Sequence, residues 1–173
     1  MSELEIAIVG GGCFWCIETI FREVKGVDSV YSGYSGGKTL NPTYREICTG
    51  LSGHAEVIQI HFNPEIISSS EILDIFWSIH DPTTLNRQGA DVGTQYRSVI
   101  FYHNEKQKDI ALKSKNNLES KKIYSDKIIT EISPLKKFFK AEEYHQNYFN
   151  LNPNESYCQM VIKPKIEKFR NKF

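Results

Sequence analysis

Two cysteines, Cys13 and Cys16, stand three positions apart directly after a run of three glycines at positions 10–12. This spacing is that of redox dithiols, whose two sulfurs can close a disulfide. A cysteine at the start of a helix also lies at the positive end of the backbone dipole, which favours the nucleophilic thiolate. We therefore expect Cys13 to be a nucleophile at a helix N-terminus, partly exposed and next to Trp15.

The same segment has other interpretations. A dinucleotide-binding turn would need a third glycine at the position that Trp15 occupies. A zinc site needs about four ligands, and no second Cys-x-x-Cys or paired-histidine motif follows in the sequence. Two buried structural cysteines beside core aromatic residues are a further alternative. The flanking aromatic residues differ, since Phe14 falls on an apolar helical stripe whereas Trp15 falls off it and can face an open site.

Ionisable groups elsewhere in the chain can assist such a nucleophile. Glu56 stands at the expected start of a strand among apolar residues. Burial there would raise the pKa of the carboxyl and keep it protonated as an acid, whereas a solvated loop carboxylate is the alternative. His54 is a candidate general base but is more often a satisfied turn histidine. His145 can pair with Cys13, although only generic spacing supports this pair.

Hydrophobic patterns indicate the elements that position these groups. Apolar or alternating runs predict strands at 5–9, 57–62 and 97–103. Apolar residues at helical spacing predict helices at 14–24, 68–79, 104–120 and 162–173. Ser68 and Glu71 form a capping-box pattern at the start of the second helix.

Three stretches rich in glycine or polar residues interrupt this alternation, at 33–42, 49–54 and 81–95. Long loops in a compact domain are usually functional. The sequence therefore predicts a single domain over residues 1–173, an α/β (α+β) sandwich with a small sheet and a site built from loops.

Composition narrows the class of protein. The chain has 173 residues, of which 40% are hydrophobic, so it can bury a substantial core. Lysine plus arginine equals aspartate plus glutamate at 21 each, which leaves no basic surplus for nucleic acid or anionic lipid. No run of about 18 apolar residues predicts a membrane span, and the N-terminus lacks the pattern of a signal peptide. We expect a cytoplasmic protein whose four cysteines serve chemistry or metal binding more than structure.

The chain resembles the A-type peptide methionine sulfoxide reductases, which act on the S epimer of the sulfoxide. The resemblance runs from about Gly11 to Cys158 and rests on six motifs in the same order. They are Gly12-Cys13-Phe14-Trp15, Gly33-Tyr34-Ser35-Gly36-Gly37, Asn41-Pro42-Thr43-Tyr44, Gly53-His54-Ala55-Glu56, Asp91-Val92-Gly93-Thr94-Gln95-Tyr96-Arg97-Ser98 and Tyr144-His145-Gln146. The resemblance implies a two-layer sandwich with a ferredoxin-like core.

The resemblance also implies a role for each matching residue. Cys13 resembles the nucleophile that attacks the sulfoxide sulfur, and Glu56 resembles the acid that protonates or hydrogen-bonds its oxygen. The other matches are the walls around the S-methyl group (Phe14 and Trp15), the hydroxyl donors (Tyr44 and Tyr96) and a supporting acid (Asp91). The family passes through a sulfenic acid and a disulfide, typically restored by thioredoxin, and the protein itself needs no metal, flavin or nicotinamide.

The resolving cysteine is where the sequence departs from a simple match. Many relatives carry glycine at the position of Cys16 and resolve from a C-terminal cysteine, which Cys158 resembles, and others resolve through position 16. A short loop costs less to close, which favours Cys16, whereas a preformed helix that must open favours Cys158. We favour Cys16, treat Cys158 as a second resolver or relay, and interpret Cys48 as a buried structural residue.

Two other functional classes remain open. A general thiol-disulfide oxidoreductase would use the two close cysteines and leave Glu56 and the tyrosines idle. A non-enzymatic peptide-binding module would tolerate the loss of Cys13. For the reductase we expect methionine sulfoxide, free or in proteins, as substrate in the repair of oxidative damage. We also expect thioredoxin as reductant and a monomeric protein, with no nucleic acid or membrane as partner.

Overall fold

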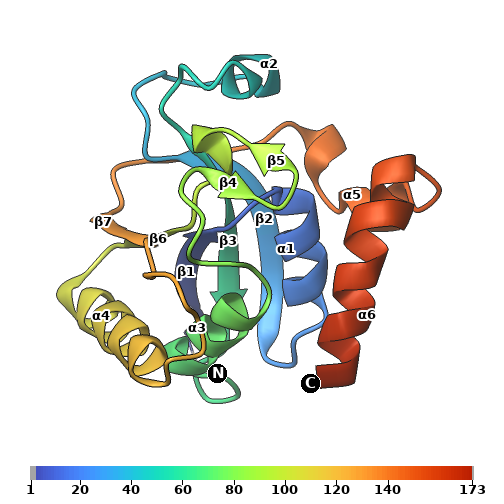
Figure 1. Cartoon of the computed structure of the whole chain (residues 1–173). Coiled ribbons are helices and arrows are strands. Elements are labelled where there is room, and N and C mark those ends of the chain that lie inside the picture. The colour runs from blue at the N-terminus through green and yellow to red at the C-terminus, as the bar shows by residue number, and fades with distance from the viewer. Residues whose placement is uncertain (1–2, 173) are drawn as a thin grey trace.

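The computed structural model describes residues 3–172, which fold around a six-stranded sheet (Figure 1). The strand order is β7-β6-β1-β3-β2-β8. The strands are β1 (Glu5–Gly10), β2 (Val27–Ser35), β3 (Ala55–Phe62), β6 (Val99–Tyr102), β7 (Glu131–Pro134) and β8 (Phe138–Lys140). Neighbouring strands are antiparallel except β6 and β7, which are parallel. The two central strands, β1 and β3, are therefore paired with each other and with one further strand each.

Helices pack on this sheet. Between residues 3 and 172 they are α1 (Phe14–Arg22), α2 (Tyr44–Cys48), α3 (Ser69–Ser78), α4 (Glu105–Ser120), α5 (Tyr148–Leu151) and α6 (Lys163–Lys172). The short elements are a ladder of β4 (Arg87–Gln88) with β5 (Asp91–Val92), 3₁₀ turns at 94–96 and 143–145, and a π-helical turn at Cys158–Ile162. Helix α1 contacts α5 and α6 on one side of the molecule, and α4 contacts α3, β6 and β7 on the other (Figure 1).

Apolar side chains fill the space on both faces of the sheet. The larger cluster joins the sheet to α1, α3 and α6 through residues such as Phe14, Phe76 and Ile166. A smaller cluster lies on the opposite face. Ile8 belongs to the smaller cluster and Val9 to the larger one, because successive side chains of a strand point to opposite faces. This arrangement confirms the predicted α+β class and its two layers.

Most of the predicted elements are present with small changes at their ends. The predicted strands correspond to β1, β3 and β6, and the predicted helices to α1, α3, α4 and α6. Ser68 and Glu71 form the predicted capping box, in which each side chain accepts the other residue's backbone N–H. Phe173, the last residue of the predicted tail stripe, and Met1 and Ser2 of the N-terminal segment lie outside the described residues.

The predicted loop at 33–42 is wrong at its start, because its first three residues belong to β2. Gly33 pairs with β3 on one side and with β8 on the other. A Cβ at this position would lie 2.3 Å from the ring of Phe138. The glycine therefore permits close packing inside a sheet, and it does not mark a turn.

The predicted loop at 81–95 is mostly irregular and contains the short β4–β5 ladder. Gln88 is buried within it, and its side-chain amide binds both backbone groups of Asp81, at 2.9 and 3.0 Å. This amide fastens the loop against the core and so determines where Asp91, three residues further on, is placed.

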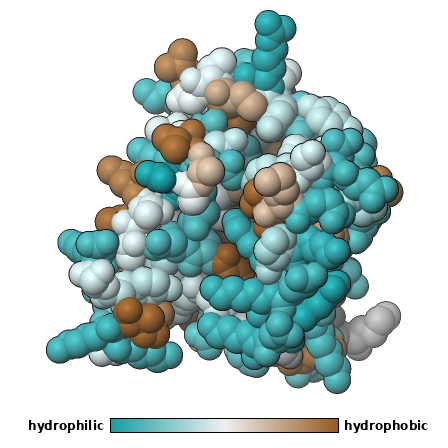
Figure 2. Space-filling model, turned by 45° about the vertical axis from the view of Figure 1, so that its right-hand side comes forward, coloured by the Kyte–Doolittle hydropathy of each residue, from teal (hydrophilic) through white to brown (hydrophobic). Residues whose placement is uncertain are grey.

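The surface on the α5 and α6 side is mainly hydrophilic. Figure 2 shows this face, on which the apolar groups are small and separate from one another. Among residues 3–172, no helix is both long enough and apolar enough to cross a membrane.

Candidate active site

Glycines at the junction of β1 and α1 allow the backbone to turn into the site. Gly12 has a φ of +90°, a left-handed conformation that favours glycine. A Cβ at Gly12 would lie 2.7 Å from Gln88, and one at Gly10 would lie 2.5 Å from the carbonyl oxygen of Glu56. The chain therefore passes close to β3 and then places Cys13 as the N-cap of α1.

The two close cysteines occupy the N-cap and N3 positions of α1. In a capping box the side chain at one of these positions reaches toward the other across the first turn. Here both positions carry thiols, and Cys13 and Cys16 hydrogen-bond each other. Cys13 has an extended backbone, with φ −64° and ψ 127°, so it lies outside the helix proper. The two sulfurs consequently meet without any unwinding of α1.

The expectation of a partly exposed thiolate is wrong. Cys13 is only 7% exposed. Burial raises the pKa of Cys13 well above its usual value, and the hydrogen bond with Cys16 and the charge of Glu56 raise it further. The same hydrogen bond lowers the pKa of Cys16. The helix dipole is therefore outweighed by burial, and the resting Cys13 is a neutral thiol.

Glu56 lies on β3 beside this junction and is 1% exposed. Its Oε1 accepts a hydrogen bond from the backbone N–H of Phe14 at 3.1 Å. Burial raises the pKa of the carboxyl to about 8. The carboxyl is therefore mostly protonated at neutral pH, as its position among apolar residues predicts.

Two phenols lie near this carboxyl. Burial raises the pKa of Tyr44 and of Tyr96, and the charge of Glu56 raises both pKa values further, so both hydroxyls stay protonated as donors. Tyr96 is held by its carbonyl, which accepts the N–H of Gly12 at 3.1 Å. Tyr44 is held at the start of α2, where its backbone N–H donates to Oε2 of Glu142 at 2.9 Å.

Tyr157 lies beside the two close thiols, a position that no sequence pattern indicates. Its hydroxyl donates to Oδ2 of Asp91 at 2.7 Å. Its pKa is raised by burial first and then by the charges of Cys13 and Cys16, and its hydroxyl hydrogen-bonds the Cys16 thiol. The only sequence signal is its position directly before Cys158. Asp91 therefore lies in the site, as predicted, but in this structure it binds Tyr157 and so holds the C-terminal segment, residues 157–172.

The two aromatic residues after Cys13 have different environments. Phe14 is fully buried, and its ring contacts those of Tyr34 and His145 at centroid distances of 5.6 and 5.2 Å. Trp15 is half-buried and stacks on Tyr148 at 3.8 Å. Trp15 is thus the more exposed of the two rings, which agrees with its place off the apolar stripe.

The suggested pairing of His145 with Cys13 is not what the structure shows. The indole N–H of Trp15 donates to Nδ1 of His145 at 3.0 Å. Burial lowers the pKa of His145 to about 4, so the ring is neutral and serves Trp15 as an acceptor. His54 is likewise a structural residue, since its ring bonds the backbone of Gly37 and of Thr39.

The remaining cysteines differ in exposure. Cys158 is fully buried in the π-helical turn, and its pKa is raised by burial first and then by the charges of Glu155 and Cys16. Cys48 is exposed, so its interpretation as a buried structural residue is wrong. The reason is that α2 has only five residues and buries Ile47 alone. The sulfur of Cys48 hydrogen-bonds the hydroxyl of Tyr44.

A large cavity lies elsewhere, between α3, α4 and α6. It has a volume of about 1070 Å³ and is lined by Trp77, Ile110 and Phe169 together with several lysines. None of the candidate site residues lines it, so its size does not identify it as the reactive centre. Within residues 3–172, no His, Cys, Asp and Glu side chains gather in a group that could hold a metal ion.

Comparison with known proteins agrees with this geometry. The sequence profile of the family described as peptide methionine sulfoxide reductase matches residues 5–173. The chain belongs to the peptide methionine sulfoxide reductase family. A relative named peptide methionine sulfoxide reductase MsrA, from Nitratiruptor sp., is 56% identical over 169 residues, which cover 98% of this chain and 96% of the relative. As a member of this family, of the MsrA type, the chain is an oxidoreductase.

Solved structures of the family have the same fold. Mxr1 from Saccharomyces cerevisiae in its reduced form gives a TM-score of 0.84 at 36% identity, covering 90% of each chain. The same yeast protein in complex with Trx2 gives a TM-score of 0.61 at 29% identity, covering 84% of this chain and 85% of that one. Four free cysteines place the present structure, like the first of these, in the reduced state.

Proposed function

We propose that this reductase converts methionine-S-sulfoxide, free or in proteins, to methionine through a sulfenic acid on Cys13. The observation that carries the proposal is the meeting of a thiol, a protonated carboxyl and two phenols in one buried site. A sulfoxide sulfur is a poor electrophile until its oxygen receives a proton or strong hydrogen bonds. Glu56 supplies the proton, and each well-placed hydroxyl donor is worth about 3 kcal/mol, by analogy with oxyanion holes.

The reaction then moves one oxygen atom from substrate to enzyme. The sulfur of Cys13 attacks the sulfoxide sulfur while Glu56 donates its proton to the sulfoxide oxygen. This attack forms a bond between the two sulfurs. The hydroxyl then passes from the substrate sulfur to the sulfur of Cys13 as the sulfur–sulfur bond breaks and its electron pair returns to the substrate. Methionine leaves with its sulfur reduced by two electrons, and Cys13 is oxidised by two electrons to a sulfenic acid. The proton of the Cys13 thiol replaces the one that Glu56 has given away, so the charge of the site is restored.

Substrate binding first has to displace Tyr157, which lies beside the two thiols. Loss of this cover removes the burial that raises the pKa of Cys13. It also frees Asp91 from the Tyr157 hydroxyl. Opening of the C-terminal segment is therefore the step that activates the nucleophile, because a solvated thiol ionises more readily than a buried one.

The choice of epimer follows from two fixed points. The sulfoxide sulfur is pyramidal, so its oxygen, its methyl group and the rest of the side chain point in three directions. When Glu56 holds the oxygen and Trp15 contacts the methyl group, only one configuration presents the sulfur to Cys13. We assign that configuration to the S epimer by family resemblance.

Cys16 is the first resolving residue in this proposal. The N-cap and N3 positions already bring its sulfur into hydrogen-bond contact with Cys13, so no helix has to open. Attack of Cys16 on the sulfenic acid releases water and closes a disulfide. Cys16 is the cysteine whose charge raises the pKa of Cys158. A second exchange would therefore pass the disulfide from Cys16 to Cys158 in the C-terminal segment.

Apolar residues around the site support protein substrates. Several large apolar side chains are more than half exposed, and they belong to the segments that build the site: Leu40, Leu51, Leu85, Val92 and Met160. Such residues suit contact with the unfolded or flexible segment around an oxidised methionine. A free amino acid would not use them.

Thioredoxin is the reductant in this proposal. The support is that a homologous reductase, yeast Mxr1, forms a complex with Trx2. A thioredoxin dithiol attacks the disulfide of the reductase, and both cysteines return to thiols as thioredoxin is oxidised.

The decisive experiment presents the two epimers of a blocked methionine sulfoxide separately, with dithiothreitol as reductant. We expect turnover of the S epimer and none of the R epimer. Insulin reduction without sulfoxide reduction would contradict the proposal and indicate a general thiol-disulfide oxidoreductase. Replacement of dithiothreitol by thioredoxin and its reductase then tests the partner. If only that coupled assay failed, the reductase activity would stand and thioredoxin would be excluded as its reductant.

A further inference from the structure

Trp15 is held by three residues that follow β8 in the chain, namely His145, Tyr148 and Tyr157. Its ring stacks on Tyr148 at 3.8 Å with an interplanar angle of 8°, and Tyr157 lies edge-on to it at 5.8 Å. Stacking is weakly directional, so a stacked ring can slide and turn within its own plane. The hydrogen bond from the indole N–H to Nδ1 of His145 is the contact that removes this freedom.

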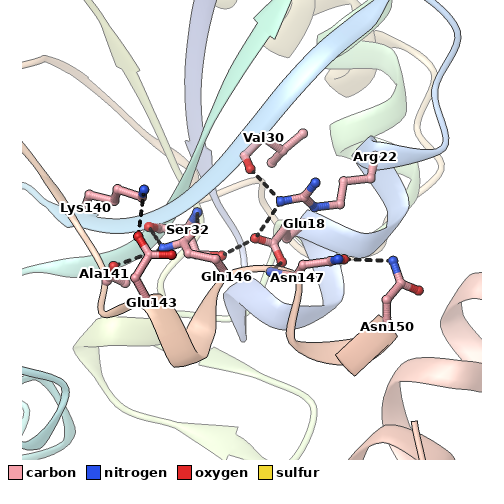
Figure 3. A network of polar contacts seen from close by, with 10 residues as sticks. All are labelled: Glu18, Arg22, Val30, Ser32, Lys140, Ala141, Glu143, Gln146, Asn147 and Asn150. Carbon is pink, nitrogen blue, oxygen red and sulfur yellow. Dashed lines mark hydrogen bonds and ion pairs between the residues drawn. The ribbon is translucent and has the colours of Figure 1, made fainter. Parts of the chain in front are cut away.

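The backbone on the C-terminal side of His145 is firmly anchored. The Gln146 side chain accepts the backbone N–H of Ser32 at 2.9 Å and donates to the Ser32 carbonyl at 3.0 Å. The N–H of Asn147 donates to the buried carboxylate of Glu18 at 2.6 Å. Figure 3 shows these contacts from Gln146 and Asn147 to the sheet and to α1. The ring of His145 is therefore placed by both elements.

The two side chains of α1 that bind His145 and the residue after Gln146 lie on the same face of the helix. Trp15 and Glu18 are three residues apart, which puts their side chains next to each other on a helix. Glu18 binds the backbone after His145, and Trp15 binds its ring. One turn of α1 therefore places the Trp15 indole relative to Nδ1 of His145, because Glu18 on the same turn holds the backbone beside that histidine.

Packing alone does not account for a histidine at this position. Because Nδ1 accepts the indole N–H, the proton of the neutral ring is on Nε2, and this buried Nε2 has no partner within residues 3–172. An unpaired buried donor is destabilising. An apolar ring would fill the space among Phe14, Tyr44 and Tyr144 without that cost. What it would lack is the acceptor for Trp15.

We propose that His145 is a positioning residue for substrate binding, whose Nδ1 fixes the position, within its own plane, of the Trp15 ring that contacts the methyl group of the sulfoxide. The inference rests on the proposed function, in which Trp15 contacts the substrate.

The test compares His145→Asn with His145→Leu, two side chains of similar shape of which only asparagine has an acceptor near the position of Nδ1. The measurement is the first turnover without reductant at increasing concentrations of blocked methionine sulfoxide. We expect His145→Leu to raise the half-saturating concentration about tenfold, as for loss of one buried hydrogen bond. We expect the maximal rate to change less, and His145→Asn to remain close to the unmodified protein. Equal losses in both variants would overturn the proposal.

A double-mutant cycle shows whether His145 acts through Trp15. In a Trp15→Phe background, which has no indole N–H, His145→Leu should cause no further loss of substrate affinity. The same loss in both backgrounds would overturn the inference and leave the proposed function intact. If Trp15→Phe alone left substrate affinity unchanged, the assumed contact of Trp15 would fail, and this inference with it.

Tryptophan fluorescence gives a readout that does not depend on turnover. The chain has two tryptophans, so Trp77→Phe leaves Trp15 as the single emitter. We expect the emission of Trp15 to shift with His145→Leu and to stay near its original position with His145→Asn. His145→Phe keeps a ring in the cluster without an acceptor, and it replaces the leucine variant if that protein does not fold. An unshifted emission in His145→Phe would contradict the proposal.

Discussion

The site has two halves, one held by the sheet and one by loops, and they differ in how firmly their backbone is fixed. Cys13, Cys16 and Glu56 form the sheet half. They follow β1, begin α1 and lie on β3, and Glu5–Val9 of β1 pair with Ile58–Phe62 of β3. Their relative positions can change only if the central sheet deforms.

Tyr44, Asp91, Tyr96 and Tyr157 form the loop half. They lie outside the six-stranded sheet and are held by side-chain and turn contacts, such as the bond of Tyr44 to Glu142 and that of Tyr157 to Asp91. Segments with few fixing contacts open at low free energy. In the proposed mechanism, the reacting sulfur and its acid are therefore pre-arranged, whereas the hydroxyl donors and Tyr157 can move when a substrate side chain enters.

The largest effect is expected from the sheet half. Cys13→Ser should abolish methionine release, because a serine hydroxyl is not a competent nucleophile at sulfur and cannot form a sulfenic acid. The measurement is methionine released per enzyme without reductant. Cys48→Ser, which removes the exposed thiol and leaves a hydroxyl that can still bond Tyr44, is the control and should still release one methionine. Substantial release by Cys13→Ser would exclude Cys13 as the nucleophile.

Glu56 should have the next largest effect. Glu56→Ala should lower the first-turnover rate about 10²–10³-fold, as for the loss of a principal oxyanion donor. Glu56→Gln should lose less, because its amide can still donate a hydrogen bond but cannot transfer a proton. Stopped-flow or quench measurements of the first turnover give the comparison. Equal rates for all three proteins would make the carboxyl a structural group.

The resolving cysteine decides whether the sheet half completes the cycle alone. Cys16→Ser should still release one methionine, then accumulate a trappable sulfenic acid and cycle with thioredoxin about tenfold or more slowly, since resolution then depends on a distant thiol. Cys158→Ser should cycle nearly normally. Peptide mapping of the oxidised protein gives the direct measurement, and a Cys13–Cys158 link without an earlier Cys13–Cys16 link would contradict this order.

The pH dependence isolates the acid of the sheet half. The pKa of Glu56 is raised to about 8, so the proton-donating form is present below that pH and is lost as the pH rises through it. The first-turnover rate of the unmodified protein is divided by that of Glu56→Gln. Both proteins contain Cys13, so most of the pH dependence that comes from its ionisation cancels in this ratio. This ratio should be constant at low pH and fall about tenfold per pH unit above 8. A ratio independent of pH would argue against proton transfer from Glu56.

The smallest effect is expected in the loop half. Tyr157→Phe removes the hydrogen bond to Asp91, and loss of one such bond should favour the open segment by about fivefold. Alkylation of Cys13 by iodoacetamide should accelerate by a similar factor. Mass spectrometry in a Cys48→Ser background avoids reaction at the exposed thiol, and Tyr144→Phe is the matched control. An unchanged alkylation rate would show that Tyr157 does not cover the sulfur.

The sequence was sufficient for features that depend on neighbouring residues. The capping box at Ser68 and Glu71 and the alternation that produced β3 are local patterns, and both predictions are confirmed. Such features need no knowledge of what lies opposite in space. For Glu56 the apolar residues on either side left two interpretations, a buried acid and a solvated loop carboxylate, and the structure shows the buried one.

The errors concern contacts between distant parts of the chain. Cys13 was expected to be exposed because nothing near it in sequence indicates Tyr157. Cys48 was expected to be buried because its own exposure depends on how much of α2 reaches the core, which was Ile47 alone. The partner of Trp15 is 130 residues away. Spacing can bring a histidine into consideration, but only the fold determines which group it serves.

The cover over Cys13 also has a consequence for the survival of the enzyme. Hydrogen peroxide oxidises thiolates, and a second and third oxidation of the same sulfur produce sulfinic and sulfonic acids that a thiol cannot reverse. A buried, protonated sulfur reacts slowly with such small oxidants. In the proposed mechanism, the nucleophile therefore stays out of reach of peroxide until a substrate displaces Tyr157. It stays usable under the same oxidising conditions that generate methionine sulfoxide.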